Sequence, residues 1–198
     1  MQTERQIQII ESSMELIASK GIQGFTIKNL SKAIGISEPG IYRHFESKTE
    51  ILLSILNNFK EMAEMLSELM KTFEGTAHEK IDFMFSRMLD LFSETPSMVS
   101  VIFSEEIFKN EELLKLKISE IMNMHAQTIE YIIARGQEEK NVRKDIEVKT
   151  LALIIMGSLR LLVKRWYIIK HNFDLNNEGR KLIIGLDKIL ACPEINLN

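Results

Sequence analysis

The sequence predicts an all-α protein, and three observations lead to that fold class. Only three prolines and nine glycines occur in 198 residues, so long stretches lack the residues that most often interrupt helices. Apolar side chains recur every three or four residues along most of the chain, which is the spacing of one helix face. No segment alternates apolar and polar residues for long enough to indicate a β-sheet.

The first helix is expected over residues 3–20, with Gly21 as its stop signal. One face of it carries four apolar side chains: Ile7, Ile10, Met14 and Ile17. A second, shorter helix follows from Thr26, a residue that favours the N-cap position, to about Ile34.

A tight turn at Gly35 leads to a third helix, for which Ser37 is the natural N-cap. Pro39 then falls in the first turn, where a missing backbone N–H costs little because these donors have no helical partner. Gly40 lowers helix stability by roughly 1 kcal/mol. Its presence indicates either close approach of another molecule to the backbone or a simple turn-like helix end.

The inward face of this third helix carries Ile41 and Phe45, which would pack on Leu30 and Ile34 of the second helix. Two short helices joined by a glycine-containing turn, with another helix before them, form a helix-turn-helix domain. We therefore predict such a DNA-binding domain within residues 1–47.

The sequence SKTE at residues 47–50 matches a capping box and starts a long helix, expected to end near Lys71. Five more helices are expected, separated by breaks at Thr95-Pro96, Asn110, Asn141 and Asn172–Asn176: 77–93, 96–108, 111–139, 145–171 and 175–190. These helices would form a larger second domain at residues 48–198.

Composition and charge favour an ordinary globular protein of the cytoplasm. The net charge of −3 does not point to nucleic acid, but residues 26–48 hold four basic and two acidic side chains. Cys192 is the single cysteine, so neither an internal disulfide nor a thiolate metal site is expected. The N-terminus lacks the pattern of a signal peptide. The apolar stretch Leu151–Val163 is too short to span a bilayer, so no membrane partner is expected.

Residues 24–52, GFTIKNLSKAIGISEPGIYRHFESKTEIL, strongly resemble the DNA-binding domain of the TetR family of transcriptional regulators. The motif positions are Thr26, Gly35-Ile36-Ser37, Ile41-Tyr42-Arg43-His44-Phe45 and Lys48. Beyond residue 52 only the number and lengths of the helices are similar. The resemblance implies a homodimeric regulator, foremost a repressor, that binds a palindromic double-stranded DNA operator. It also implies release by a small-molecule inducer bound in the second domain. The apolar side chains of that domain favour a hydrophobic effector, and no cofactor is expected.

Nine residues are expected at the DNA: Thr26, Lys28, Ser37, Pro39, Gly40, Tyr42, Arg43, His44 and Lys48. Arg43 is best placed to enter the major groove and grip a guanine, unless it forms a solvated salt bridge with Glu46 or Glu38. Tyr42, His44 and Lys48 would hold backbone phosphates; the alternative for Tyr42 and His44 is a half-buried structural pair. Glu38 faces phosphates unfavourably unless it pairs with Arg43 or accepts a hydrogen bond from a cytosine.

The middle helices carry many large, adaptable apolar side chains, which are typical of a hydrophobic binding pocket or of an ordinary methionine-containing core. The residues expected around an effector are Met84, Phe85, Met88, Phe92, Met98, Ile102, Phe103, Met122, Met124, His125, Ile155 and Arg160. A cation within an apolar run needs a partner. For Arg160 this could be Glu105, Glu106, a carboxylate of a second subunit, or the acidic head of a fatty-acid-like effector.

The last two helices are expected to form a dimer interface, because residues 151–163 are apolar on nearly all sides. The residues expected in that interface are Gly157, Ser158, Leu161, Leu182, Leu186 and Ile189. A helical adaptor without a DNA target is the first alternative function, and an enzyme is the second. The scattered histidines His78, His125 and His171 and the lack of a glycine-rich phosphate loop argue against an enzyme or a metal site.

Overall fold

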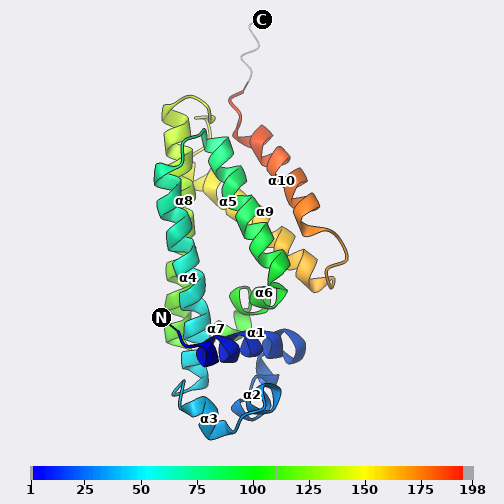
Figure 1. Ribbon diagram of the computed structural model, residues 1–198. Coiled ribbons are helices and arrows are strands. Elements are labelled where there is room, and N and C mark those ends of the chain that lie inside the picture. The colour runs from blue at the N-terminus through cyan, green and yellow to red at the C-terminus, as the bar shows by residue number, and fades with distance from the viewer. Residues whose placement is uncertain (1, 110, 194–198) are drawn as a thin grey trace, which may run out of the picture. The chain divides into compact units, whose positions relative to one another are not determined.

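The computed structural model describes residues 2–109 and 111–193, and all regular structure in these residues is helical (Figure 1). Ten helices follow one another in these ranges: α1 (Glu4–Gly24), α2 (Ile27–Ile34), α3 (Glu38–Tyr42), α4 (Lys48–Thr72), α5 (Ala77–Glu94), α6 (Pro96–Ile102), α7 (Glu105–Phe108), α8 (Glu112–Glu138), α9 (Val148–Ile168) and α10 (Leu175–Leu190). The predicted all-α fold class is confirmed.

The chain forms two compact units. The described residues of the first unit come from 2–62, 95–109 and 111–121, and those of the second come from 63–94 and 122–193. Helices α4 and α8 each contribute to both units. The predicted boundary at residue 47 separates a DNA-binding domain from an effector-binding domain by function, whereas the two units are defined by packing. The functional boundary stays a prediction.

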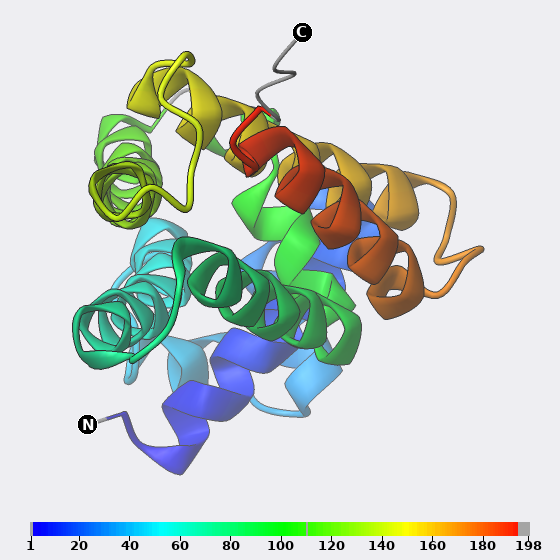
Figure 2. The same ribbon diagram turned by 90° about the horizontal axis from the view of Figure 1, so that it is seen from above.

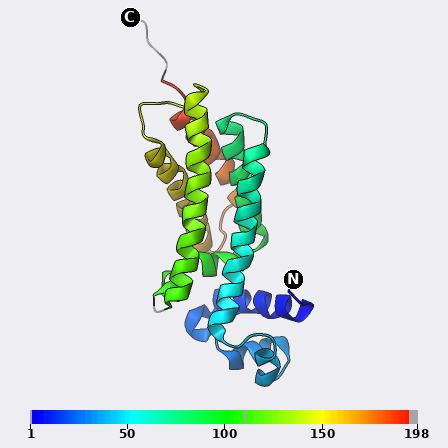
Figure 3. The ribbon, with the colours of Figure 1, turned by 90° about the vertical axis from the view of Figure 1, so that its left-hand side faces the viewer.

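Within each unit, α4 and α8 run side by side and in parallel (Figure 3). In the first unit, Lys60 Nζ lies 2.8 Å from Glu120 Oε1. In the second unit, the Thr128 hydroxyl donates a hydrogen bond of 2.9 Å to Ser67 Oγ. Polar pairs between α4 and α8 therefore fix the register of the two helices at two positions, one in each unit.

In the first unit, α1 packs on α2 and α6 through a buried apolar face. Ile10, Met14 and Ile17 are buried, as predicted, and Ile9 extends the same face. Ile7 shares this face by its spacing, but it is 43% exposed and so is not part of the buried core. Ile7 lies near the start of α1, at the edge of the packed surface.

The helix expected at 145–171 is shorter than predicted, because α9 spans Val148–Ile168. Two other departures from the expected helix limits have a visible local cause. Gly21 has φ 68° and ψ 177°, so it kinks the first helix instead of ending it, and α1 continues to Gly24. The single helix expected at 96–108 is split into α6 and α7. The Ser104 hydroxyl oxygen accepts a hydrogen bond of 3.3 Å from the Ile107 N–H, which offers the backbone an alternative to a continuous helix.

In the second unit, α10 packs on α5 and α9, and Figure 2 shows α10 beside α9. Gly179 permits close approach of α10 to α5, because a Cβ atom there would collide with the Leu89 side chain. The His78 ring connects α5 to two further segments: its Nδ1 lies 2.8 Å from Asp187 Oδ1 and its Nε2 lies 3.0 Å from the Asn141 carbonyl oxygen. None of the helices in the described ranges has the length and apolar character needed to cross a membrane.

Candidate nucleic-acid interface

Local signals build the turn between α2 and α3. Thr26 Oγ1 accepts a hydrogen bond of 3.1 Å from the Asn29 N–H, and Ser37 Oγ accepts one of 3.2 Å from the Gly40 N–H. Gly35 ends α2 in the left-handed region, with φ 76°, which a glycine adopts without strain. Both predicted N-caps are therefore confirmed, and Pro39 lies in the first turn of α3.

Burial separates an inward from an outward face in this part of the first unit. Leu30, Ile41 and Phe45 are buried, and Ile34 is only half-buried. Pro39, Tyr42 and Arg43 are exposed, and Tyr42 keeps 51% of its surface accessible. The short helix α3 thus presents polar and aromatic side chains outward from an apolar base.

Arg43 and Glu38 are both exposed on this outward side. In the described part of the chain, no ion pair joins Arg43 to Glu38 or Glu46. The guanidinium is therefore available to a partner from outside the chain. A planar guanidinium carries five N–H donors, which suit a guanine edge or a phosphate.

Gly40 is not required by the packing of the chain itself. A Cβ atom at this position would lie 3.4 Å from Ser37 Oγ and 3.6 Å from the Ile36 side chain, which are ordinary contact distances. The two readings of Gly40, close approach by another molecule and a turn-like helix end, therefore both remain predictions.

The start of α4 differs in one detail from the predicted capping box. Ser47 Oγ accepts a hydrogen bond of 3.1 Å from the Glu50 N–H, as expected. The Glu50 carboxylate, however, accepts from the N–H of Glu46, one residue before the expected donor. The second hydrogen bond of the capping box therefore comes from the Glu46 N–H instead of the Ser47 N–H.

Lys48 has partners inside the first unit. Its Nζ donates a hydrogen bond of 3.3 Å to the Ile22 carbonyl and lies 5.0 Å from the centroid of the Phe25 ring. Burial lowers the pKa of Lys48, and the charge of Glu111 opposes that shift. The side chain therefore ties the start of α4 to the end of α1, a role that the motif did not reveal.

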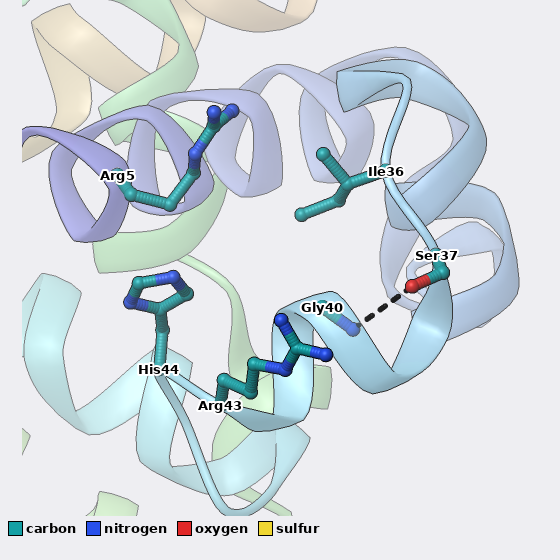
Figure 4. A pocket seen from close by; sticks show the side chains of 6 residues that line it. All are labelled: Arg5, Ile36, Ser37, Gly40, Arg43 and His44. Atoms are coloured by element: carbon teal, nitrogen blue, oxygen red, sulfur yellow. Dashed lines mark hydrogen bonds between the residues drawn. The ribbon is translucent and has the colours of Figure 1, made fainter.

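A hollow of about 360 Å³ lies between the start of α1 and the segment around α3 (Figure 4). Its lining residues are Arg5, Ile36, Ser37, Gly40, Arg43 and His44. Arg5 comes from α1 and lies across from Arg43 and His44. Of the predicted DNA-binding residues, the structure thus brings Ser37, Gly40, Arg43 and His44 around one space. Thr26 and Lys28 are exposed at the start of α2 and do not line it.

Arg5 was missed by the sequence analysis. The signal that could have found it is the capping box Thr3-x-x-Gln6, in which the Gln6 side chain accepts from the Thr3 N–H and the Thr3 side chain accepts from the Gln6 N–H. That box places Arg5 in the first turn of α1. Its proximity to His44 depends on tertiary packing.

The residues expected around an effector are divided between the units. The second unit contains the buried residues Met84, Phe85, Phe92 and Ile155, the half-buried residues Met88, Met124, His125 and Arg160, and the exposed residue Met122. The first unit contains Met98 and Ile102, which are buried, and Phe103, which is half-buried. Burial lowers the pKa of His125. Glu106, one expected partner of Arg160, accepts a hydrogen bond of 2.9 Å from the Gln23 amide in the first unit.

The residues expected in the dimer interface lie on α9 and α10 at different depths. Gly157, Leu161 and Ile189 are exposed, whereas Ser158 and Leu182 are half-buried. Leu186 is buried within its own chain and therefore belongs to the core of the second unit. Sequence reasoning missed three strongly exposed apolar side chains on the same two helices: Leu153, Ile168 and Ile184.

Family models cover nearly the whole chain. Residues 9–55 match the model described as "Bacterial regulatory proteins, tetR family". Residues 56–185 match the model described as "YsiA-like protein, C-terminal region".

Individual relatives are distant but extend along most of the chain. The Bacillus subtilis (strain 168) "Fatty acid metabolism regulator protein" is 24% identical over 170 residues, which cover 85% of this chain and 87% of the relative. The Escherichia coli (strain K12) "Probable acrEF/envCD operon repressor" is 20% identical over 193 residues, covering 94% and 87%. The crystal structure of the Bacillus subtilis transcriptional regulator FadR with stearoyl-CoA has a TM-score of 0.77 at 23% identity, covering 91% of this chain and 96% of FadR.

Proposed function

This chain belongs to the tetR family of bacterial regulatory proteins, and from that premise we propose that it is a homodimeric, cytoplasmic repressor with a palindromic operator. It is a ligand-responsive DNA-binding regulator of transcription, as its family and relatives are. The observation that carries the repressor proposal is the outward side of α3. There Arg43 is exposed and pairs with neither Glu38 nor Glu46 in the described part of the chain.

The division of labour at the DNA follows from this geometry. Arg43 enters the major groove and reads a guanine through O6 and N7, while Tyr42, His44, Thr26 and Lys28 hold the backbone. Lys48 acts through its tie to Ile22 and Phe25 as well as through any phosphate it reaches.

The effector we propose is a long apolar chain with an anionic head, such as a fatty acyl-CoA. Two features support this: the large apolar side chains of the second unit, and the presence of stearoyl-CoA in the FadR structure. The effector must bind the DNA-free conformation more tightly than the DNA-bound one, because a ligand shifts an equilibrium only by its differential affinity.

The dimer interface we propose is the outer face of α9 and α10. Leu153, Leu161 and Ile184 expose 72%, 68% and 58% of their surface on this face. Apart from its sequence neighbours and the nearby backbone of α9, no atom of the described residues lies within 4 Å of a Cβ atom built at Gly157, so a second helix could approach closely there. Large exposed apolar patches are uncommon on monomers. To reach two successive turns of one face of the DNA, the two α3 helices of such a dimer must lie about 34–36 Å apart.

Selection of genomic fragments tests this function directly. The purified protein should enrich a small set of palindromic fragments, and a long-chain acyl-CoA should release them. On DNA-cellulose the protein should be retained at low salt and elute at about 0.3 M salt, because phosphate contacts release counterions. If no retention occurs at low salt, the repressor function is wrong and the helical adaptor, the first alternative, becomes the better reading. Retention without release by acyl-CoA would overturn only the choice of effector.

A further inference from the structure

We propose that Arg5 is an additional DNA-contacting residue, and that the hollow beside it seats a backbone phosphate of the bound duplex (Figure 4). This inference rests on the proposed function. It adds the first turn of α1 to the contact elements already proposed, which are α2, α3 and the residues from His44 to the start of α4. Neither the family motif nor the sequence pattern assigned a role to this turn.

The first turn of α1 is held in place by Gln6. Its Oε1 accepts a hydrogen bond of 3.0 Å from the Thr3 N–H, and its Nε2 donates one of 3.3 Å to the His44 carbonyl oxygen. One side chain therefore caps α1 and fastens it to the segment that follows α3. Arg5 precedes Gln6 in that turn and lines the same hollow as Arg43 and His44.

The chemistry of the hollow suits an anion. Arg5 and Arg43 carry positive charge, His44 offers a ring N–H, and Ser37 offers a hydroxyl donor. Among the described residues, no aspartate or glutamate lines the space. Arg5 Nη1 donates to Gln8 Oε1 over 2.5 Å, which uses one of five N–H donors and leaves the others available.

A phosphate fits this hollow better than a base edge does. Arg5 lies on the α1 side of the space, and Ser37, Arg43 and His44 lie on the α3 side. A tetrahedral group between them can accept from both sides once the Arg5 guanidinium turns from Gln8 toward the space. Arg43 can turn toward the groove while Arg5 holds the backbone, which separates base reading from positioning. The contact should therefore strengthen binding to every duplex by a similar factor.

The test compares Arg5→Gln with Lys20→Gln, a control that removes an exposed charge near the other end of α1. Both variants bind an arbitrary duplex of about 30 base pairs at several salt concentrations, so no operator is needed. Arg5→Gln should reduce the slope of log affinity against log salt by about 0.9 and weaken binding roughly fivefold near 0.1 M salt. Lys20→Gln should change neither quantity, and both variants should melt like the wild type.

Three outcomes are decisive. If Arg5→Gln shows the wild-type slope of log affinity against log salt, Arg5 does not contact a phosphate and the proposal is wrong, although the repressor function stands. If Arg5→Gln instead weakens binding to some arbitrary duplexes much more than to others, Arg5 reads a base and the proposed phosphate contact is also wrong. If the wild type itself fails to bind duplex DNA, the proposed function falls as well.

A second variant tests the positioning role of Gln6. Gln6→Met keeps the length of the side chain but loses the hydrogen bond to the His44 carbonyl. The effect of Arg5→Gln on the salt slope should then shrink in the Gln6→Met background, because residues that act together are not additive. Additive effects would show that Gln6 only caps α1.

Discussion

Helices α3 and α9 show two ways in which one chain can face an outside partner. Helix α3 has five residues and depends on the Ser37 cap and on Ile41 beneath it, and its outward side is polar. Helix α9 has 21 residues, buries Leu151, Ile155 and Val163, and still exposes large apolar side chains on another side.

The difference teaches what each surface can bind. A short capped helix fixes a few donors at defined positions, which suits the phosphates and base edges of DNA. A long helix that is apolar on most sides gains free energy only when a second apolar surface covers it. Polar specificity is therefore expected in the first unit and apolar association in the second.

The largest expected effect is a loss of stability from core substitutions, which tests whether both units depend equally on buried phenylalanines. Phe25 in the first unit and Phe85 in the second are both buried. Phe25→Ala and Phe85→Ala should each lower the free energy of unfolding by about 3–5 kcal/mol, because each leaves a cavity. Phe25→Ala should also weaken DNA binding, since the Lys48 ammonium loses the ring beneath it. Urea unfolding gives the first quantity; a loss below about 1 kcal/mol at either site would contradict the burial argument.

The second-largest effect is expected at the exposed apolar side chains of α9, which we propose as part of the dimer interface. Leu161→Glu would place a carboxylate in the proposed α9–α10 interface, where burial of an unpaired charge is costly. The dimer should dissociate at least about 100-fold more readily, or about 2.7 kcal/mol. Light scattering at micromolar concentration should then report the 22.9 kDa monomer.

The matched control for that interface is Met65→Glu. Met65 is 74% exposed but lies on α4, outside the α9–α10 face. This variant should remain dimeric. If both variants dissociate, or neither does, the interface lies elsewhere.

A smaller effect, on DNA binding, is expected from substitutions of the exposed basic side chains of α2 and of the segment around α3. Arg43→Ala should cost about 1–3 kcal/mol and relax the preference at one base pair per half-site. Lys28→Ala should instead weaken all sequences equally and reduce the salt slope by about 1. Competition among operator variants separates the two patterns; an unchanged ranking in Arg43→Ala would remove its base-reading role.

The smallest effect concerns the capping box of α5. The Thr76 N–H, followed by the Thr76 hydroxyl, lowers the pKa of Glu79 from about 4.5. The unfolded chain therefore takes up this proton first as the pH falls. The stabilisation is present above about pH 4.5 and is lost as the pH drops through the lower folded pKa.

Glu79→Gln tests this linkage, because glutamine keeps an acceptor for Thr76 but does not titrate. The difference in melting temperature between pH 7 and pH 3 should be smaller than in the wild type. Glu74→Gln, an exposed neighbour, should leave that difference unchanged. If Glu79→Gln lost as much melting temperature between pH 7 and pH 3 as the wild type does, the Thr76–Glu79 cap would not contribute to the pH dependence.

Most helix ends could be predicted from the sequence because their signals are local. Thr26, Ser37 and Ser47 accept hydrogen bonds from N–H groups three residues ahead, and a spacing of three residues is visible in the sequence. The helical period likewise marked the buried residues Leu30, Ile41 and Phe45. Where two local signals competed, as at Ser104, the predicted helix was too long.

The sequence by itself determined the all-α class, the helix order and the outward placement of Arg43, because these depend on contacts within a few residues. Tertiary structure decided the rest. The hydrogen bond from the Gln6 amide to the His44 carbonyl joins residues 38 apart in the sequence and brings the first turn of α1 close to the segment after α3. The Lys48 ammonium likewise bonds to the Ile22 carbonyl within the fold. Tertiary structure also buried Leu186 in its own core. A helical period gives only the face of a residue; what covers that face depends on packing between distant segments.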